Sequence, residues 1–157
     1  MIEALADRVL AVTRRSWFPR LMSAGIAVGV GTVFALSALL VPSPDGHGTH
    51  LQLGLGPCTF LTLTGWPCPM CGATTSFTLM AHLRPLAAFV NQPFAAGLFL
   101  LSAGSFAVSV AEILDPRDRW TRILDAIEPY EGRLAALFLA AMGIAWAYKI
   151  ATMGVFG

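Results

Sequence analysis

The sequence predicts an all-α integral membrane protein: three transmembrane helices plus a short interfacial or re-entrant helical hairpin that carries a Cys-Pro-x-Cys-Gly corner. Three observations support this fold class. The chain is 56% hydrophobic and only 12% charged, whereas charged residues make up roughly a quarter of ordinary soluble domains. Three stretches of about twenty residues contain at most one charge each. All three cysteines lie in one short segment between the first two stretches.

The N-terminal part of the chain predicts a surface segment followed by the first span. Residues 1–20 carry four arginines beside apolar residues at helical spacing, which is typical of a cytoplasmic interfacial helix or of a basic flank that sets topology. Residues 21–41 contain no charge and, as a helix of about 30 Å, match the hydrocarbon thickness. No small-x-small cleavage pattern follows, so we expect an uncleaved span rather than a signal peptide.

Residues 42–92 are expected to form a loop that contains the cysteine hairpin. Prolines on both sides of Cys68 favour extended backbone there. After Gly72 an apolar stripe predicts two short helical pieces separated at Arg84-Pro85. These pieces are too short and too polar to span a bilayer, so we expect them in the interface or partly inserted, with Cys68 and Cys71 at a helix start.

The rest of the chain predicts two more spans. Residues 93–114 form the second, and residues 115–133 a cytoplasmic loop with an interfacial helix that ends near Pro129. Residues 134–156 form the third, with Lys149 near its end, where its side chain can reach the interface. Four arginines precede the first span and four follow the second, whereas only Arg84 lies between them. This bias predicts a cytoplasmic N-terminus, with the cysteine segment and the C-terminus on the outer face.

The three cysteines, Cys58, Cys68 and Cys71, have several interpretations. Backbone N–H groups at a helix start stabilise a thiolate, which suits thiol redox chemistry. Thiols two residues apart also suit zinc or copper, with Cys58 as a third ligand and one histidine as a fourth: His82, His47 or His50. In an oxidising compartment Cys58 could instead bridge to Cys68 or Cys71 and leave one cysteine odd. The remaining interpretation is a tightly packed structural corner.

These motifs, taken together, resemble a bacterial membrane-protein family known as domain of unknown function 2752. The resemblance runs from Cys58 to about Leu101 and rests on an ordered set of residues: Cys58, Leu63-Thr64-Gly65, Cys68-Pro69-Met70-Cys71-Gly72-Ala73-Thr74, Asn91 and Pro93. It implies a small multispan protein of the bacterial inner (cytoplasmic) membrane with the cysteine motif between spans. The family carries no established activity.

Two positions depart from the family pattern. An arginine follows C-G-x-T in the family, whereas this chain has Thr75. The family's Asn-Pro pair is interrupted here by Gln92. A guanidinium beside two thiols would stabilise a thiolate or contact an anion, so its replacement by Thr75 weakens a catalytic interpretation.

From these observations we expect a small structural or accessory subunit of a larger membrane complex rather than an enzyme, with the lipid bilayer and other membrane subunits as partners. The alternative is a membrane thiol-redox or metal-binding protein that uses Cys58, Cys68 and Cys71. Only that alternative calls for a cofactor, zinc or copper. A transporter is disfavoured because the spans lack charged or broken-helix elements. A net charge of +1 gives no field with which to recruit nucleic acid.

Overall fold

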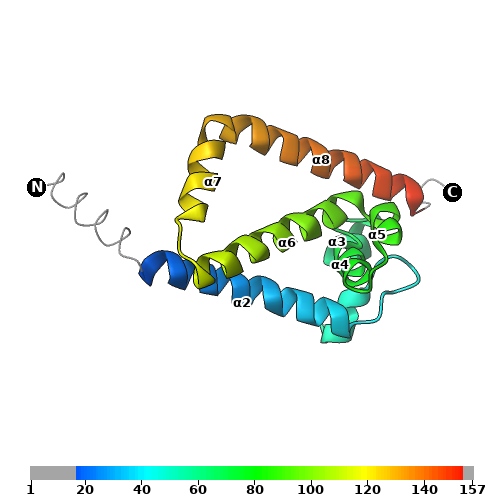
Figure 1. Cartoon of the computed structure of the whole chain (residues 1–157). Helices are drawn as coiled ribbons and strands as arrows, with labels where there is room; N and C mark the ends of the chain where they lie inside the picture. Colours follow the sequence, from blue (N-terminus) through cyan, green and yellow to red (C-terminus); the bar gives the residue numbers. More distant parts are fainter. Residues whose placement is uncertain (1–16, 154–157) are drawn as a thin grey trace, which may run out of the picture. The chain divides into compact units, whose positions relative to one another are not determined.

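A computed structural model describes residues 17–153, and all of its regular structure in that range is helical (Figure 1). Three helical segments are long and apolar enough to cross a membrane: Phe18–Leu39, Pro93–Leu114 and Arg119–Thr152. The predicted fold class is therefore confirmed, and the protein is a membrane protein of the helical type. Of the surface helix expected over residues 1–20, residues 1–16 lie outside the described residues, whereas residues 17–20 form the start of the first long helix, which begins earlier than the predicted span of residues 21–41.

The long helices are α2 (Trp17–Leu39), α6 (Pro93–Leu114) and α8 (Glu131–Thr152). The spans within α2 and α6 have 22 residues each, about 33 Å of helix, which suits a hydrocarbon layer of about 30 Å. Pro93 opens α6 because its fixed φ and missing N–H fit the first helical turn. Before α8 come the surface helix α7 (Arg119–Ile127) and the short 3-10 helix η2 (Glu128–Tyr130).

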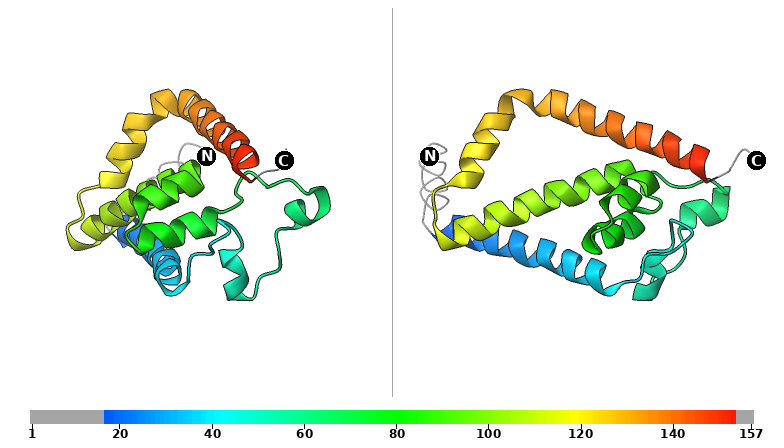
Figure 2. Two further views of the ribbon diagram at one scale, coloured as in Figure 1. Left: turned by 90° about the vertical axis from the view of Figure 1, so that its right-hand side faces the viewer. Right: turned by 45° about the vertical axis from the view of Figure 1, so that its right-hand side comes forward.

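Four short helices lie between α2 and α6: η1 (Thr49–Leu53), α3 (Thr59–Thr64), α4 (Ala73–Ala81) and α5 (Pro85–Asn91). The last two are the helical pieces that the apolar stripe predicts, and they pack side by side (Figure 2). The sequence alone does not predict η1 or α3. Both end at a glycine in the left-handed conformation, Gly54 and Gly65, which closes a short helix without strain.

The described residues form two compact units, each with its own contacts. One contains residues up to 32 together with 102–131, and the other contains residues 33–101 together with those from 132 onward. The core of the second unit is small and consists of Leu79, Met80, Ala88 and Ala96, with Ala87 and Phe99 packed against it. The Phe99 ring extends this core, since its centroid lies 4.6 Å from that of Phe34 and 5.4 Å from that of Phe77.

The turn between α4 and α5 places a leucine in an unfavourable conformation. Leu83 has a φ of 57°, in the left-handed region where glycine is usual. The N–H of Arg84 donates to the Leu79 carbonyl at 2.9 Å and the N–H of Leu83 to the Met80 carbonyl at 3.1 Å, the two bonds of a Schellman motif. Leu83 is 88% exposed, so its side chain adds little packing, and the two backbone hydrogen bonds stabilise the conformation.

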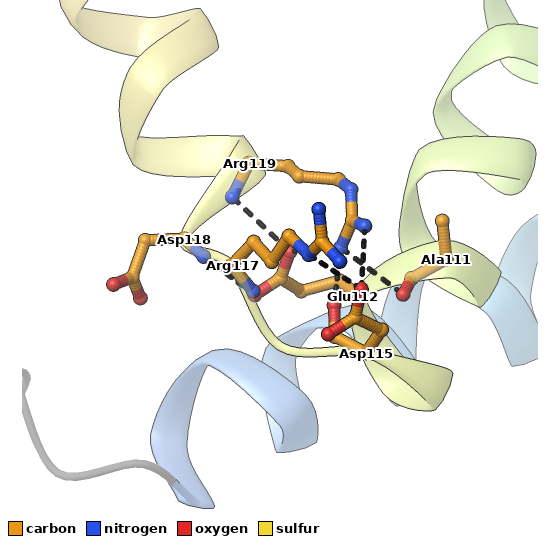
Figure 3. A network of polar contacts seen from close by, with 6 residues as sticks. All are labelled: Ala111, Glu112, Asp115, Arg117, Asp118 and Arg119. Atoms are coloured by element: carbon orange, nitrogen blue, oxygen red, sulfur yellow. Dashed lines mark hydrogen bonds and ion pairs between the residues drawn. The ribbon is translucent and has the colours of Figure 1, made fainter.

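A buried carboxylate organises the other unit. Glu112, near the end of α6, is fully buried and accepts hydrogen bonds from the backbone N–H groups of Arg117, Asp118 and Arg119 at 3.0, 2.9 and 3.1 Å (Figure 3). The Arg119 guanidinium adds an ion pair at 3.2 Å. Asp118, the N-cap of α7, makes no side-chain cap hydrogen bond. Glu112 therefore binds the N–H of the first residue of α7 and those of the two residues before it, and so fixes the start of this helix.

This network predicts a measurable loss of stability when the Glu112 charge is removed. We expect Glu112→Gln to lower the free energy of unfolding by about 2 kcal/mol, because buried donors that face a carboxylate would face a neutral amide. Thermal unfolding in mild detergent measures the effect. The matched control is Glu131→Gln at the exposed start of α8, with an expected change within about 0.5 kcal/mol. Equal stabilities of the two variants would contradict this account.

Candidate functional site

The cysteines are positioned by α3 and by the turn that follows it. Cys58 is the N-cap of α3, and Gly65, with a φ of 72°, closes that helix. The chain then turns at Cys68, whose carbonyl accepts the N–H of Cys71 at 2.9 Å. Gly72, with a φ of 87°, is the N-cap of α4. Cys58 is thus brought near Cys68 and Cys71 by two local elements. One is the short helix α3, which ends at the left-handed Gly65, and the other is the cysteine turn, which ends at the left-handed Gly72.

All three thiols line one cavity of about 430 Å³. Cys58 and Cys68 are half-buried, whereas Cys71 is buried. The opposite wall comes from the loop after α2 and from η1, and includes Asp45, His47 and His50. The structure therefore gathers the cysteines of the predicted site around a space large enough for a small molecule or a peptide side chain.

The three thiols differ in acidity. The pKa of Cys58 is lowered, first by the backbone N–H of Leu61 in the first turn of α3. Burial acts in the opposite direction, and the neighbouring Cys68 thiol offsets part of that effect. Burial raises the pKa of Cys68 to about 11, and its hydrogen bond to Cys58 adds to the rise. Burial also raises the pKa of Cys71, and Lys149 only partly offsets this rise. The sequence expectation of acidic thiols at positions 68 and 71 is thus reversed, and the acidic thiol is Cys58.

The histidines do not complete a metal site in the described residues. The Nε2 atom of His82 lies 3.0 Å from the Leu40 carbonyl oxygen, and His82 is not among the residues that line the thiol cavity. His47 and His50 do line it, but a ring nitrogen of each faces a backbone carbonyl, at 2.9 and 3.2 Å. Between residues 17 and 153 no three His, Cys, Asp or Glu side chains gather into a group that could hold a metal ion.

The cysteine turn is fastened by three side chains that bind its carbonyl groups. The Trp146 indole donates to the Pro67 carbonyl at 2.7 Å, Gln92 to that of Pro69 at 3.0 Å, and Asn91 to that of Gly72 at 3.0 Å. Gln92 is fully buried. Its oxygen also accepts the N–H of Ala95, at 2.9 Å, in the first turn of α6. The residue that interrupts Asn-Pro therefore ties the motif to the next span.

Lys149 is the cation at the centre of this part of the protein. It is only 4% exposed, contrary to the expectation that its side chain reaches the interface. Its ammonium group donates to the Asn91 side-chain oxygen at 2.9 Å, and to the carbonyls of Gly46 and Asn91 at 3.2 and 3.3 Å. Sequence reasoning missed this junction, because the only signal was a lysine inside an apolar stretch.

Thr75, which the sequence comparison singles out as a departure from the expected arginine, is a buried packing residue. It is 1% exposed, and its hydroxyl lies 2.8 Å from that of Thr49. The Thr49 hydroxyl also accepts the N–H of Ser43 at 3.0 Å. Thr74 lines the thiol cavity, and its carbonyl accepts the Thr78 hydroxyl at 2.8 Å. The hydrogen bond between Thr75 and Thr49 thus joins α4 to η1 and to the loop after α2.

The crowding at Gly72 predicts a strong effect of one methyl group. A Cβ at this position would lie 2.5 Å from the Gly46 carbonyl oxygen and 3.1 Å from the Lys149 ammonium. We expect Gly72→Ala to cost about 3 kcal/mol of unfolding free energy, because overpacking adds to left-handed strain. Gly65→Ala is the control, since Gly65 has a similar φ but nothing within 4 Å, and should cost about 1 kcal/mol. Thermal unfolding compares them, and equal losses would contradict a crowded junction.

Comparison with known proteins gives one match. Residues 58–106 match the family model described as "Protein of unknown function (DUF2752)". No curated protein and no solved structure matches the chain. The matched segment begins at Cys58 and includes the cysteine turn, α4, α5 and the first part of α6. The match supports the resemblance drawn from the motif, over residues 58–106 of the chain.

Proposed function

We propose that this protein carries out thiol–disulfide exchange at a membrane, with Cys58 as the attacking thiol and Cys68 as the resolving thiol. The observation that carries the proposal is that Cys58 and Cys68 meet at the wall of one cavity, close enough for each thiol to shift the pKa of the other. A thiolate is the reactive form of cysteine. The lowered pKa of Cys58 and the raised pKa of Cys68 match an attacking thiolate beside a protonated neighbour.

The proposed reaction uses a disulfide on a partner molecule as the oxidant. The Cys58 thiolate attacks one sulfur of that disulfide, forms a mixed disulfide and releases the other sulfur as a thiolate, which takes up a proton. Cys68 then loses its proton and attacks the Cys58 sulfur, so that a Cys58–Cys68 disulfide forms and the second partner thiol leaves. The partner gains two electrons and two protons, which the two cysteines lose. The reverse sequence oxidises a dithiol substrate.

Cys71 is assigned no bond-forming step. It is buried, its pKa is raised, and it contacts Cys68 from the far end of the same turn. Among the pairings that the sequence leaves open, we propose Cys58 with Cys68, because both are half-buried at the cavity wall and each thiol shifts the pKa of the other. A bridge of Cys58 to Cys71 would need the buried thiol to come forward.

We also propose the location and orientation of the chain. The arginine bias around the spans supports a bacterial inner membrane protein with a cytoplasmic N-terminus and the thiol cavity on the outer face. Such a compartment supplies exchangeable disulfides, whereas cytosolic thiols are kept reduced. The accessory-subunit expectation stays a prediction without a specific observation in its favour, since the exposed apolar faces of α2, α6 and α8 suit lipid as well as another subunit.

The exchange reaction predicts a trapped intermediate in one variant. When the full chain in mild detergent is treated with oxidised glutathione, we expect Cys68→Ser to accumulate a mixed disulfide on Cys58, because the resolving thiol is gone. The wild-type chain and Cys71→Ser should proceed to a Cys58–Cys68 disulfide. The reaction should start below the pH at which an ordinary thiol ionises, because a lowered pKa keeps more Cys58 as thiolate. Peptide mass mapping identifies the bonds.

Two results of this experiment would contradict the proposal. One is glutathione on Cys71 or Cys68 in preference to Cys58. The other is a mixed disulfide that persists in the wild-type chain as long as in Cys68→Ser, which would show that Cys68 does not resolve it.

The orientation predicts which reagent reaches the cavity. In intact bacterial cells that express a Cys68→Ser, Cys71→Ser chain, a membrane-impermeant maleimide should label Cys58, because only the outer face is open to it. The same chain with Cys58 also replaced by serine is the blank. Labelling that requires permeabilised cells would place the cavity in the cytoplasm and contradict the topology.

A further inference from the structure

A second cavity, of about 780 Å³, lies beside the thiol cavity and shares part of its wall. It is bounded by the loop after α2, by α5 and by the last turns of α8. Thr75 and His47 line both cavities. The thiol chemistry uses none of the features that distinguish the second cavity, which include Arg84, Lys149 and Tyr148.

The charges on its wall are unbalanced. Arg84 and Lys149 are its cations and Asp45 its one carboxylate. In the part of the chain that the structure describes, neither cation forms an ion pair. The Lys149 ammonium is held by neutral oxygens only, those of Asn91 and Gly46. A buried ammonium without a counter-ion is costly, so an anion in this cavity would be stabilised.

Arg84 offers the free donors that such an anion needs. Its guanidinium makes no hydrogen bond within residues 17–153, and the residue is exposed at the start of α5. Arginine binds phosphate groups through two parallel N–H bonds. The buried Lys149 then supplies a fixed positive charge in the cavity wall, and the exposed Arg84 supplies the two parallel N–H donors.

Apolar and strongly exposed residues lie in the chain on both sides of Arg84 and along α5. Leu83, Leu86 and Val90, next to Arg84 or on α5, are 88%, 83% and 69% exposed. Leu83 also holds a left-handed backbone conformation that a leucine adopts at a cost. In a membrane protein these side chains are accounted for by contact with acyl chains rather than water.

We propose that the second cavity binds the phosphate headgroup of an anionic phospholipid, with Arg84 as the hydrogen-bonding ligand of the phosphate, Lys149 as a positive charge in the cavity wall, and the acyl chains against Leu83, Leu86 and Val90. The charged cavity wall and the exposed apolar residues Leu83, Leu86 and Val90 are independent observations. A phospholipid is the ligand whose chemistry satisfies both. This site does not depend on thiol exchange.

Native mass spectrometry of the full chain in mild detergent tests the proposal. We expect one phosphatidylglycerol to bind saturably and phosphatidylcholine, whose headgroup has no net charge, to bind more weakly. Arg84→Gln should weaken phosphatidylglycerol binding roughly tenfold, because it removes charge-assisted hydrogen bonds. Arg122→Gln is the control, since it removes the same charge from an exposed position on α7.

The outcomes separate the alternatives. Equal weakening by Arg84→Gln and Arg122→Gln would show only non-specific attraction between cationic protein and anionic lipid, and would overturn the site. Equal binding of phosphatidylcholine would overturn the requirement for net negative charge. Inorganic phosphate is the last probe: if it displaces phosphatidylglycerol at low concentration in wild type but not in Arg84→Gln, the lipid is overturned as the source of the phosphate.

Discussion

The contacts of the Lys149 ammonium hold together the part of the protein that carries the motif. Its oxygen partners belong to the loop after α2 and to the end of α5. The side-chain amide of one of them, Asn91, also donates hydrogen bonds to the Gly72 carbonyl at 3.0 Å and to the Ser76 hydroxyl at 2.9 Å. The long helices are apolar on most sides, so sliding between them changes little hydrophobic energy in a bilayer. A directional polar junction is therefore what fixes the position of the cysteine turn.

The same junction separates two chemical environments. On one side, thiols face a cavity in which amide dipoles and a neighbouring S–H favour one thiolate. On the other, two cations without an ion pair among the described residues line a cavity, and exposed apolar residues lie next to Arg84. The loop residues Ser43, Asp45 and His47 line both. A ligand in either cavity would contact a loop that also covers the other, so the two sites share a structural element although their chemistry differs.

Sequence patterns predict those parts of the fold that depend on local spacing. The apolar stretches predict the long helices, and Arg84-Pro85 predicts the break between α4 and α5. The junction is different, because its partners are far apart in the chain. Lys149 binds Asn91 and Gly46, which are 58 and 103 positions away, and Trp146 binds Pro67, which is 79 positions away. No periodicity encodes such a pairing. The identity of the acidic thiol is missed for a related reason: it depends on α3, a six-residue helix too short for its pattern to be recognised.

The fastening of the cysteine turn has a mechanical consequence. Three of its carbonyls accept hydrogen bonds from side chains of α5, of α8 and of the residue between α5 and α6. In contrast, α3 contains no buried residue, and its Leu63 is 79% exposed. Any change in the distance between the sulfurs of Cys58 and Cys68 is therefore absorbed by displacement of α3, while the turn acts as the stationary frame. A partner that contacts α3 could then sense the oxidation state of the pair without touching either sulfur.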